Sequence, residues 1–549
     1  MTCMTCGNGT IVRHLRRGKD VLLQFTSLPR SSDNSAYHLA LITSTVSDCL
    51  HEDCSDAIIS TLDTNSLLAL GLTCRAASIS IQPFLVKDAV VVGKAPKVAA
   101  FCSFILSKRL AGRIRGLSIT YVAFQREGNF RSETASVAVL LAEVLEEAHG
   151  LQTFGLGEVA ISIFNCQPRL LDILQNIPSL KSFSIWQDSP EDFEALPCIR
   201  GLHSLVAGIW WYKTLPAQYS TLSRFISASA ETLTQLELYD SVPAVDPAEV
   251  NAYLPLMSSG DTIFPQLRSL RLNGVVPAVT ATELVRAFPN IESLFMSRSR
   301  LDHETDDFFS HLDSTMDTWP HLTTIMVPTQ TALILARRYQ HTLRNITVEP
   351  DVFDTMADFD QLLDAIRGCS VKKLCFRSSC DDIVEEGLRS NGDESESDDE
   401  GPSEITASWV FANVAKAVPH LRILAPIIMI FYGTDELAYI EELANADTIQ
   451  QALAALTHLE CLSLTIRAST VTDETGFEGE FERVARSLFR ASSALYLQIT
   501  VIWDFHGMRL DWYWRRTSGS SEPNTGNMPM SKISQDEYDD AEKRILQEK

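Results

Sequence analysis

The chain is poor in basic residues relative to acidic ones. Its 549 residues include 46 Lys and Arg against 70 Asp and Glu, which gives a formal net charge of −24. Proteins that bind nucleic acid or anionic membranes attach through Lys and Arg, so this balance argues against both kinds of partner. A long apolar run is also lacking, because the longest, around residues 423–432, is too short to cross a bilayer.

Signals for secretion and catalysis are missing as well. No apolar segment of the secretory kind follows Met1, so we expect an intracellular protein of the cytoplasm or nucleus. The basic cluster in residues 13–19 leaves a transit peptide as a minor alternative. The chain has no P-loop, no G-x-S-x-G, no kinase motif set and no G-x-G-x-x-G after a strand. We therefore expect a non-catalytic protein without a cofactor, and the alternative is an enzyme with an unfamiliar site.

Metal-ligand patterns are absent too. The twelve cysteines are scattered, which favours free thiols in a reducing compartment. Cys3 and Cys6 form a C-x-x-C pair, but no second pair completes a zinc site. The spacing of Cys369, Cys375 and Cys380 also matches no set of zinc ligands, so we expect no metal.

What the sequence does contain is one apolar pattern, L-x-x-L-x-L, repeated along most of its length. A clear copy is "PQLRSLRLNG" at 265–274. The full set comprises Ile114-Leu117-Ile119, Leu151-Phe154-Leu156, Leu180-Phe183-Ile185, Leu233-Leu236-Leu238, Leu267-Leu270-Leu272, Ile291-Leu294-Met296, Leu322-Ile325-Val327, Leu343-Ile346-Val348, Val371-Leu374-Phe376 and Leu459-Leu462-Leu464, with weaker copies at Leu202-Leu205, Leu421-Leu424 and Ala494-Leu497-Ile499. Segments with helical spacing separate the copies, so the predicted unit is helix, turn and strand.

Such a unit predicts a solenoid. In a strand, alternate residues share a face, so the last two apolar positions of each copy point the same way. One unit cannot bury that face alone, and stacked neighbours build a continuous core. We expect an α/β fold with parallel strands on the concave side and helices on the convex side. The alternative, one or two large α/β domains, would have more continuous apolar strands than these, in which polar residues alternate with the apolar ones.

The pattern resembles the leucine-rich repeat family in its longer intracellular form, over residues 114–500. The Asn or Cys that usually follows the last Leu in that family is mostly missing, and Asn273 is the one near match. The resemblance therefore implies that helices, rather than an asparagine ladder, hold the turns. Histidines beside the first apolar position, such as His203 and His458, are predicted to face solvent.

A small all-α unit is predicted at residues 50–87. The stretch "LHEDCSDAIISTLDTNSLLALGLTCRAA" resembles an F-box, with departures at His51, Cys54 and Ser55 in the first turn. The resemblance implies a Skp-type adaptor as partner and, through it, a cullin. It places the apolar contact, or the core beneath it, at Leu50, Ile58, Ile59, Leu62, Leu67, Leu68 and Leu72. The alternative is that these helices only cap the solenoid.

The remaining boundaries follow from composition. Residues 1–45 form a poorly defined arm, and residues 88–113 a linker strand and helix that opens at Pro96 and ends near Gly112. Residues 381–404 hold eleven acidic residues and one Arg, which favours a disordered insertion. Residues 501–549 form a C-terminal cap with several aromatic residues, followed by a tail. This order of parts resembles F-box proteins of mushroom-forming fungi.

The resemblance to F-box proteins therefore implies the substrate-recognition adaptor of a cullin-based ubiquitin ligase. Its target, a protein that the sequence does not identify, would bind the concave strand positions that alternate with the core. The candidates are Trp186, Glu237, Tyr239, Arg271, Phe295 and Arg377. The alternative is a leucine-rich repeat scaffold unrelated to ubiquitin.

Overall fold

The protein was analysed as a computed structural model, which forms two compact units. Unit 1 comprises residues 1–267 and 274–279, and unit 2 comprises residues 268–273 and 280–549. The structure describes residues 10–17, 20–27, 59–62, 64–120, 130–157, 160–187, 198–209, 224–240, 253–254, 262–273, 276–277, 280–297, 309, 318–348, 356–379, 407–430, 446–468, 477–503, 508–517 and 530–547. The acidic stretch 381–404 lies outside these residues.

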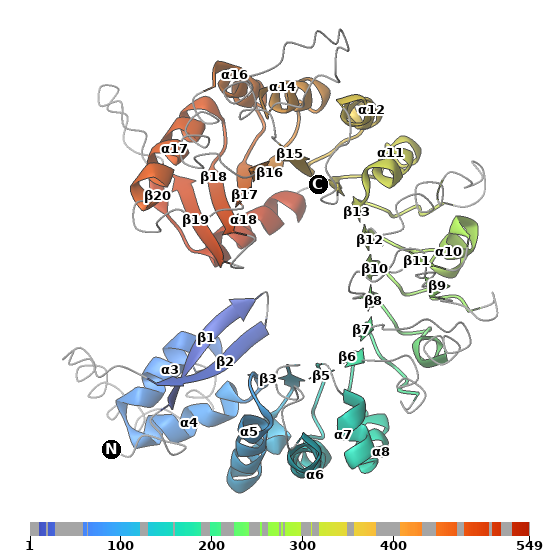
Figure 1. Ribbon diagram of the computed structural model, residues 1–549, viewed down its shortest axis with the longest axis vertical. Coiled ribbons are helices and arrows are strands. Elements are labelled where there is room, and N and C mark those ends of the chain that lie inside the picture. Colours follow the sequence, from blue (N-terminus) through green and yellow to red (C-terminus); the bar gives the residue numbers. More distant parts are fainter. Residues whose placement is uncertain are drawn as a thin grey trace, which may run out of the picture. The chain divides into compact units, whose positions relative to one another are not determined.

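Unit 1 alternates helices with parallel strands (Figure 1). Its strands are β3 (Asp88–Val91), β4 (Gly116–Ile119), β5 (Thr153–Leu156), β6 (Ser182–Gln187), β7 (Ser204–Ile209) and β8 (Gln235–Asp240), and each pairs in parallel with the next. Its helices are α3 (Thr64–Thr73), α4 (Arg75–Leu85), α5 (Ala95–Lys108), the 3₁₀ turn η1 (Ala111–Arg113), α6 (Phe130–Glu147), α7 (Ala160–Cys166) and α8 (Arg169–Gln175). Short β9 (Tyr253–Leu254) and β11 (Val276–Pro277) pair separately.

Unit 2 continues the same alternation. Its parallel strands are β10 (Ser269–Asn273), β12 (Ser293–Ser297), β13 (Thr324–Val327), β14 (Asn345–Val348), β15 (Lys373–Ser379), β16 (Ile423–Ile430), β17 (Cys461–Ala468) and β18 (Tyr496–Trp503). Antiparallel β19 (Met508–Arg516) and β20 (Met530–Lys532) follow. Its helices are α10 (Ala281–Ala287), α11 (Thr329–Arg338), α12 (Met356–Ile366), α14 (Ala407–Ala417), α16 (Asp447–Ala455), α17 (Phe477–Ala491) and α18 (Gln535–Gln547).

The strand order supports the solenoid over the large α/β domain. Within each unit the parallel strands neighbour one another in chain order, without the reversal that marks a doubly wound sheet. Equivalent residues pair, so that Leu270 faces Leu294 and Leu294 faces Ile325. All three apolar positions are buried in every copy of the pattern that has three. The fold is thus a solenoid-like α/β array, as the repeated pattern predicts.

One further copy of the pattern precedes those found in the sequence. Val86, Ala89 and Val91 are buried, and β3 pairs with β4 in the register used by the later strands. Sequence inspection missed this copy because its central residue is the small Ala89. Segment 88–113, expected to be a linker, therefore has the strand and helix of a repeat. An unexpected hairpin, β1 (Thr10–Arg17) and β2 (Asp20–Ser27), pairs with β3.

The helix in this first repeat ends earlier than predicted. Helix α5 begins with Ala95 and carries Pro96 in its first turn, as expected, but it ends at Lys108 rather than near Gly112. Arg109 terminates it with φ 55°, a left-handed conformation, and Gly112 lies in the following 3₁₀ turn. Two backbone bonds, from Arg109 and Leu110 to the carbonyls of Leu106 and Ile105, satisfy the helix end.

Hydroxyl groups contribute to the turns where the family asparagine is missing. Ser179, Thr232 and Ser493 each stand just before the first apolar position of a repeat. Each donates a hydrogen bond to the carbonyl of the first apolar residue in the preceding repeat, at 2.7, 2.7 and 3.0 Å respectively. These bonds link neighbouring turns directly, so the helices are not alone in holding them.

Candidate functional site

The face of each sheet opposite the buried core offers the first candidate surface, and we call it the inner face. Its residues alternate along each strand with the core residues, as Trp186 in β6 alternates with buried Ile185. Five of the six predicted contact residues, Trp186, Glu237, Tyr239, Arg271 and Phe295, are half-buried on this face. Arg377 belongs to β15, and its side chain lies outside the described part of the structure.

Three of the predicted residues meet in unit 1. The rings of Trp186 in β6 and Tyr239 in β8 lie 5.1 Å apart across the intervening β7. Gly208 in β7 makes this approach possible, because a Cβ added there would lie 1.9 Å from the indole of Trp186. We call Trp186, Gly208, Gln235, Glu237 and Tyr239 the Trp186 cluster.

Hydrogen bonds fix the carboxylate of this cluster. The Tyr239 hydroxyl donates to Glu237 Oε2 at 2.7 Å, and the Gln235 amide donates to Glu237 Oε1 at 2.6 Å. A carboxylate held by the Tyr239 hydroxyl thus lies next to a pair of aromatic rings on one half-buried surface. Aromatic faces and carboxylates both attract cations, so this arrangement suits a Lys or Arg side chain of a partner.

The other predicted pair meets in unit 2. Arg271 and Phe295 occupy paired positions of β10 and β12, and the guanidinium carbon lies 4.9 Å from the centre of the ring. Next along these strands, the Ser297 hydroxyl donates to the side chain of Asn273. This inner face is positive and polar where that of the Trp186 cluster is negative and aromatic. The inner face at β10 and β12 therefore differs in chemistry from that at β6 to β8, although the cores of these repeats are alike.

Helices α3 and α4 offer the second candidate surface. Of the predicted adaptor contacts, Leu67 is buried, while Ile59, Leu62 and Leu68 are half-buried. Leu72 is 62% exposed, and Ile79, which sequence reasoning did not select, is 57% exposed. Leu50 and Ile58 lie outside the described residues. Two large apolar side chains on adjoining helices therefore face solvent.

The packing of α3 on α4 depends on a glycine. A Cβ at Gly71 would lie 2.4 Å from Cδ1 of buried Ile81, so the two helices approach closely at this point. The Sγ of Cys74 accepts a hydrogen bond from the backbone amide of Ala77 and caps α4. These local contacts fix the packing of the two helices that carry Leu72 and Ile79.

The histidines beside the first apolar positions lie in exposed turns. His203, His321, His341, His420 and His458 are all exposed, as predicted for a position in the turn. His420 and His458, in neighbouring repeats, have rings 5.5 Å apart. Within the described part of the chain, no three His, Cys, Asp or Glu residues converge in a way that could hold a metal ion. The described helices include none that is long and apolar enough to cross a membrane.

The last repeats contain the expected aromatic residues and, in addition, a helix that the sequence analysis did not predict. Trp514 is buried, and Trp512 stacks on Phe481 of α17 at 4.3 Å, which fits the predicted aromatic cap. Tyr513 points the other way, onto the inner face, where Tyr538 of α18 lies 5.6 Å away. A helix thus occupies the inner face in the last repeats. Its available signal was the sequence Ser534-Gln-Asp-Glu537, a capping pattern that precedes Tyr538.

Comparisons with known proteins give little beyond this geometry. No protein-family model matches the chain, and no curated protein matches its sequence. Among solved structures, a chain from the crystal structure of the Rad7 and Elc1 complex in yeast is similar over 74% of this chain and 96% of that one. The sequence identity is 14% and the TM-score is 0.38, and we draw no conclusion on function from this likeness.

Proposed function

We propose that the protein is a substrate-recognition adaptor of a cullin-based ubiquitin ligase. Helices α3 and α4 would bind a Skp-type adaptor, and the leucine-rich repeat array would bind the target protein through its inner face. The observation that carries the proposal is the exposure of Leu72 and Ile79 on the helical unit that resembles an F-box. Exposed apolar side chains that gather into one patch are typical of interaction surfaces.

The array supplies the second half of the proposed function. Its core residues recur because stacking requires them, whereas its inner-face residues vary from strand to strand. Within the proposed target site, we expect the Trp186 cluster to contribute most to binding, since Trp and Tyr side chains often dominate the binding energy of an interface. The adaptor would act by positioning a target beside the ligase, so no covalent chemistry is assigned to this chain.

The test is co-purification with a Skp-type adaptor. Leu72→Asp should lower the affinity at least tenfold, because it places a charge in an apolar contact, while the chain stays folded since Leu72 is exposed. Val139→Asp is the matched control, because Val139 is also an apolar residue on a helix of unit 1 and is 44% exposed. Circular dichroism verifies folding of both variants.

The outcome decides between the two readings of the helical unit. If the folded wild-type chain does not bind the adaptor, α3 and α4 serve as a cap and the protein is a repeat scaffold outside any ubiquitin ligase. Equal binding by the Leu72→Asp variant would also contradict the proposed contact.

A further inference from the structure

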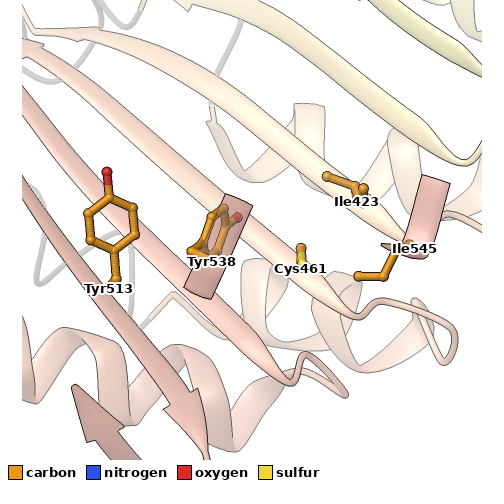
Figure 2. Packing of buried hydrophobic residues seen from close by; sticks show 5 residues of the cluster. All are labelled: Ile423, Cys461, Tyr513, Tyr538 and Ile545. Atoms are coloured by element: carbon orange, nitrogen blue, oxygen red, sulfur yellow. The ribbon is translucent and has the colours of Figure 1, made fainter. Parts of the chain in front are cut away.

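Helix α18 lies on the inner face of the last strands of unit 2. Figure 1 shows α18 on the side of β16 to β18 opposite α14, α16 and α17. Its Tyr538 and Ile545 are 1% and 0% exposed and pack with Ile423, Cys461 and Tyr513 of the sheet. Figure 2 shows these five side chains side by side across the strands. The helix therefore has the position that a bound target would have.

Charged contacts hold the helix along its length. Glu542 pairs with Lys373 of β15, and Glu537 pairs with Arg515 of β19 at 2.6 Å. Arg422, just before β16, donates to the backbone carbonyl of Ile545 at 3.2 Å. Residues 535–547 contain five acidic and two basic residues. An acidic helix therefore lies against the basic residues Lys373, Arg422 and Arg515 of unit 2.

The inner face itself changes where the helix lies. On β13 and β14 its residues are mostly polar and include Thr324, Asn345 and Thr347. On β16, β17 and β19 the corresponding positions include Ile423, Cys461 and Tyr513, all of them buried beneath α18. These three residues form an apolar strip on an inner face that is otherwise polar, for example at Ser463 and Gln498, which share a hydrogen bond. The apolar strip is therefore a site for a second layer rather than a solvated surface.

We propose that the inner face of β15 to β19 is a binding site for an acidic amphipathic helix, and that α18 occupies it until a target presents a helix of the same pattern. The pattern begins with an aromatic residue and has Ala three residues later, Glu four residues later and an aliphatic residue seven residues later, as in Tyr538, Ala541, Glu542 and Ile545. The role of the target rests on the proposed function, but the reversible occupation by α18 does not.

Replacement is physically reasonable for two reasons. A helix of 13 residues is marginal on its own, so α18 forms stably only while it is docked. Three of its residues, Tyr538, Ala541 and Ile545, are buried, which is a small apolar contact for a helix. Because α18 is tethered to its site, a competing helix needs a higher affinity or a high concentration to displace it.

Cys461 reports whether the helix is docked. It is fully buried beneath α18, and burial raises the pKa of its thiol to about 12. Since the thiolate is the reactive form, alkylation should be slow while the helix covers it and faster once the helix leaves. Cys102 in α5 of unit 1 is an internal reference, because it is also fully buried and its thiol pKa is also raised to about 12 by burial.

The experiment compares iodoacetamide labelling of both cysteines in the full chain by mass spectrometry. Glu542→Lys should accelerate labelling of Cys461 at least tenfold, because the new lysine repels Lys373 and weakens the docking of α18. Labelling of Cys102 should not change. The double variant Lys373→Glu/Glu542→Lys should restore slow labelling. The control is Asp540→Lys, another change from acid to lysine, on the exposed side of α18, where Asp540 pairs with exposed Lys543 of the same helix; labelling of Cys461 should stay slow in this variant.

A peptide then tests replacement. A fluorescent peptide of residues 530–549 should bind the Glu542→Lys chain at least tenfold more tightly than the wild type, whose site is occupied. The same peptide with Tyr538→Ala and Ile545→Ala should not bind. Peptide binding should also be lost when Ile423 is changed to Asp, which charges the apolar site.

The following results would overturn the proposal. If Cys461 and Cys102 react at the same rate in every variant, α18 separates from the sheet only when the whole chain unfolds and is a fixed part of the core. Failure of the peptide to bind the Glu542→Lys chain, or a dimer that exchanges α18 between copies, would exclude a site for a partner helix. None of these measurements involves the Skp-type adaptor, so failure of the proposed ligase function would be seen separately.

Discussion

Gly208 shows how the absence of a side chain at one position allows two aromatic residues of other strands to meet. The residue lies on β7 between two aromatic residues, and the absence of a Cβ lets the indole of Trp186 cross the strand toward Tyr239. Any larger residue would push the indole outward and separate it from the ring. The hydrogen bonds that orient Glu237 come from Tyr239 and Gln235, so the position of one ring affects the carboxylate as well.

Gly208→Ala should therefore disturb the Trp186 cluster and destabilise unit 1. The added methyl group would lie 1.9 Å from the indole, and such overpacking costs about 1–3 kcal/mol. Urea unfolding measures the loss, and near-ultraviolet circular dichroism follows the aromatic contact. Gly112→Ala is the control, because the nearest atom to its new Cβ is 3.8 Å away. Unchanged stability and spectrum in Gly208→Ala would mean that the indole does not lie over the glycine.

Thr280 and Glu283 form a capping box at the start of α10. The Glu283 amide donates to the Thr280 hydroxyl at 3.3 Å, and the Thr280 amide donates to the Glu283 carboxylate at 2.8 Å. The Thr280 hydroxyl also donates to the Glu283 carboxylate, at 3.0 Å. The bond from the Thr280 amide, and after it the bond from the Thr280 hydroxyl, lower the pKa of Glu283 from its usual 4.5. A lowered pKa in the folded state stabilises the helix above pH 4.5, and this contribution disappears as the pH falls through the lowered value.

We expect Thr280→Ala to destabilise α10 by about 1 kcal/mol, a typical value for a lost cap. Hydrogen exchange of the α10 amides, corrected for intrinsic rates, measures this effect. The same amides in the wild type should lose protection below pH 4.5, and Glu283→Gln should remove that dependence on pH. Protection that does not change with pH in the wild type would show that the carboxylate contributes nothing to the cap.

The helix and strand units were the most predictable elements, for a physical reason. Their core positions recur at fixed spacing, and the alternation of Leu270 and Leu272 with polar Arg271 is visible in the sequence. Helices α10, α11, α12, α14, α16 and α17 all lie between copies of the apolar pattern, as the predicted unit of helix, turn and strand requires. The inner face was predictable in position only, since alternation identifies which residues face inward but not which of them meet across strands.

The positions of elements that depend on distant partners were not predictable. Helix α18 has only Tyr538, Ala541 and Ile545 on its buried side, and its partners in β16, β17 and β19 are remote in sequence. The hairpin of β1 and β2 is likewise fixed by pairing with β3 rather than by a strong pattern of its own. Gly208 gave no signal either, because its importance arises from the indole of the neighbouring strand.

The molecule as a whole combines a uniform core with a varied surface. Each described repeat contacts its neighbours through the same paired positions, for example Ile346 in β14 with Leu374 in β15 and Leu374 with Leu424 in β16. Stability in such arrays is approximately a sum of repeat and nearest-neighbour terms. A core substitution should consequently act on its own repeat and on the adjoining ones.

Leu374→Ala tests this property. Leu374 is fully buried, and removal of a buried leucine side chain costs about 2–5 kcal/mol. Hydrogen exchange should then speed up in β14, β15 and β16 and in helices α12 and α14, while β4 and β5 of unit 1 keep the protection of the wild type. Cys375→Ala, on the inner face of the same strand, is the control and should change exchange much less. Equal loss of protection along the entire chain would contradict the nearest-neighbour description, because it would show that the whole array unfolds as one cooperative unit.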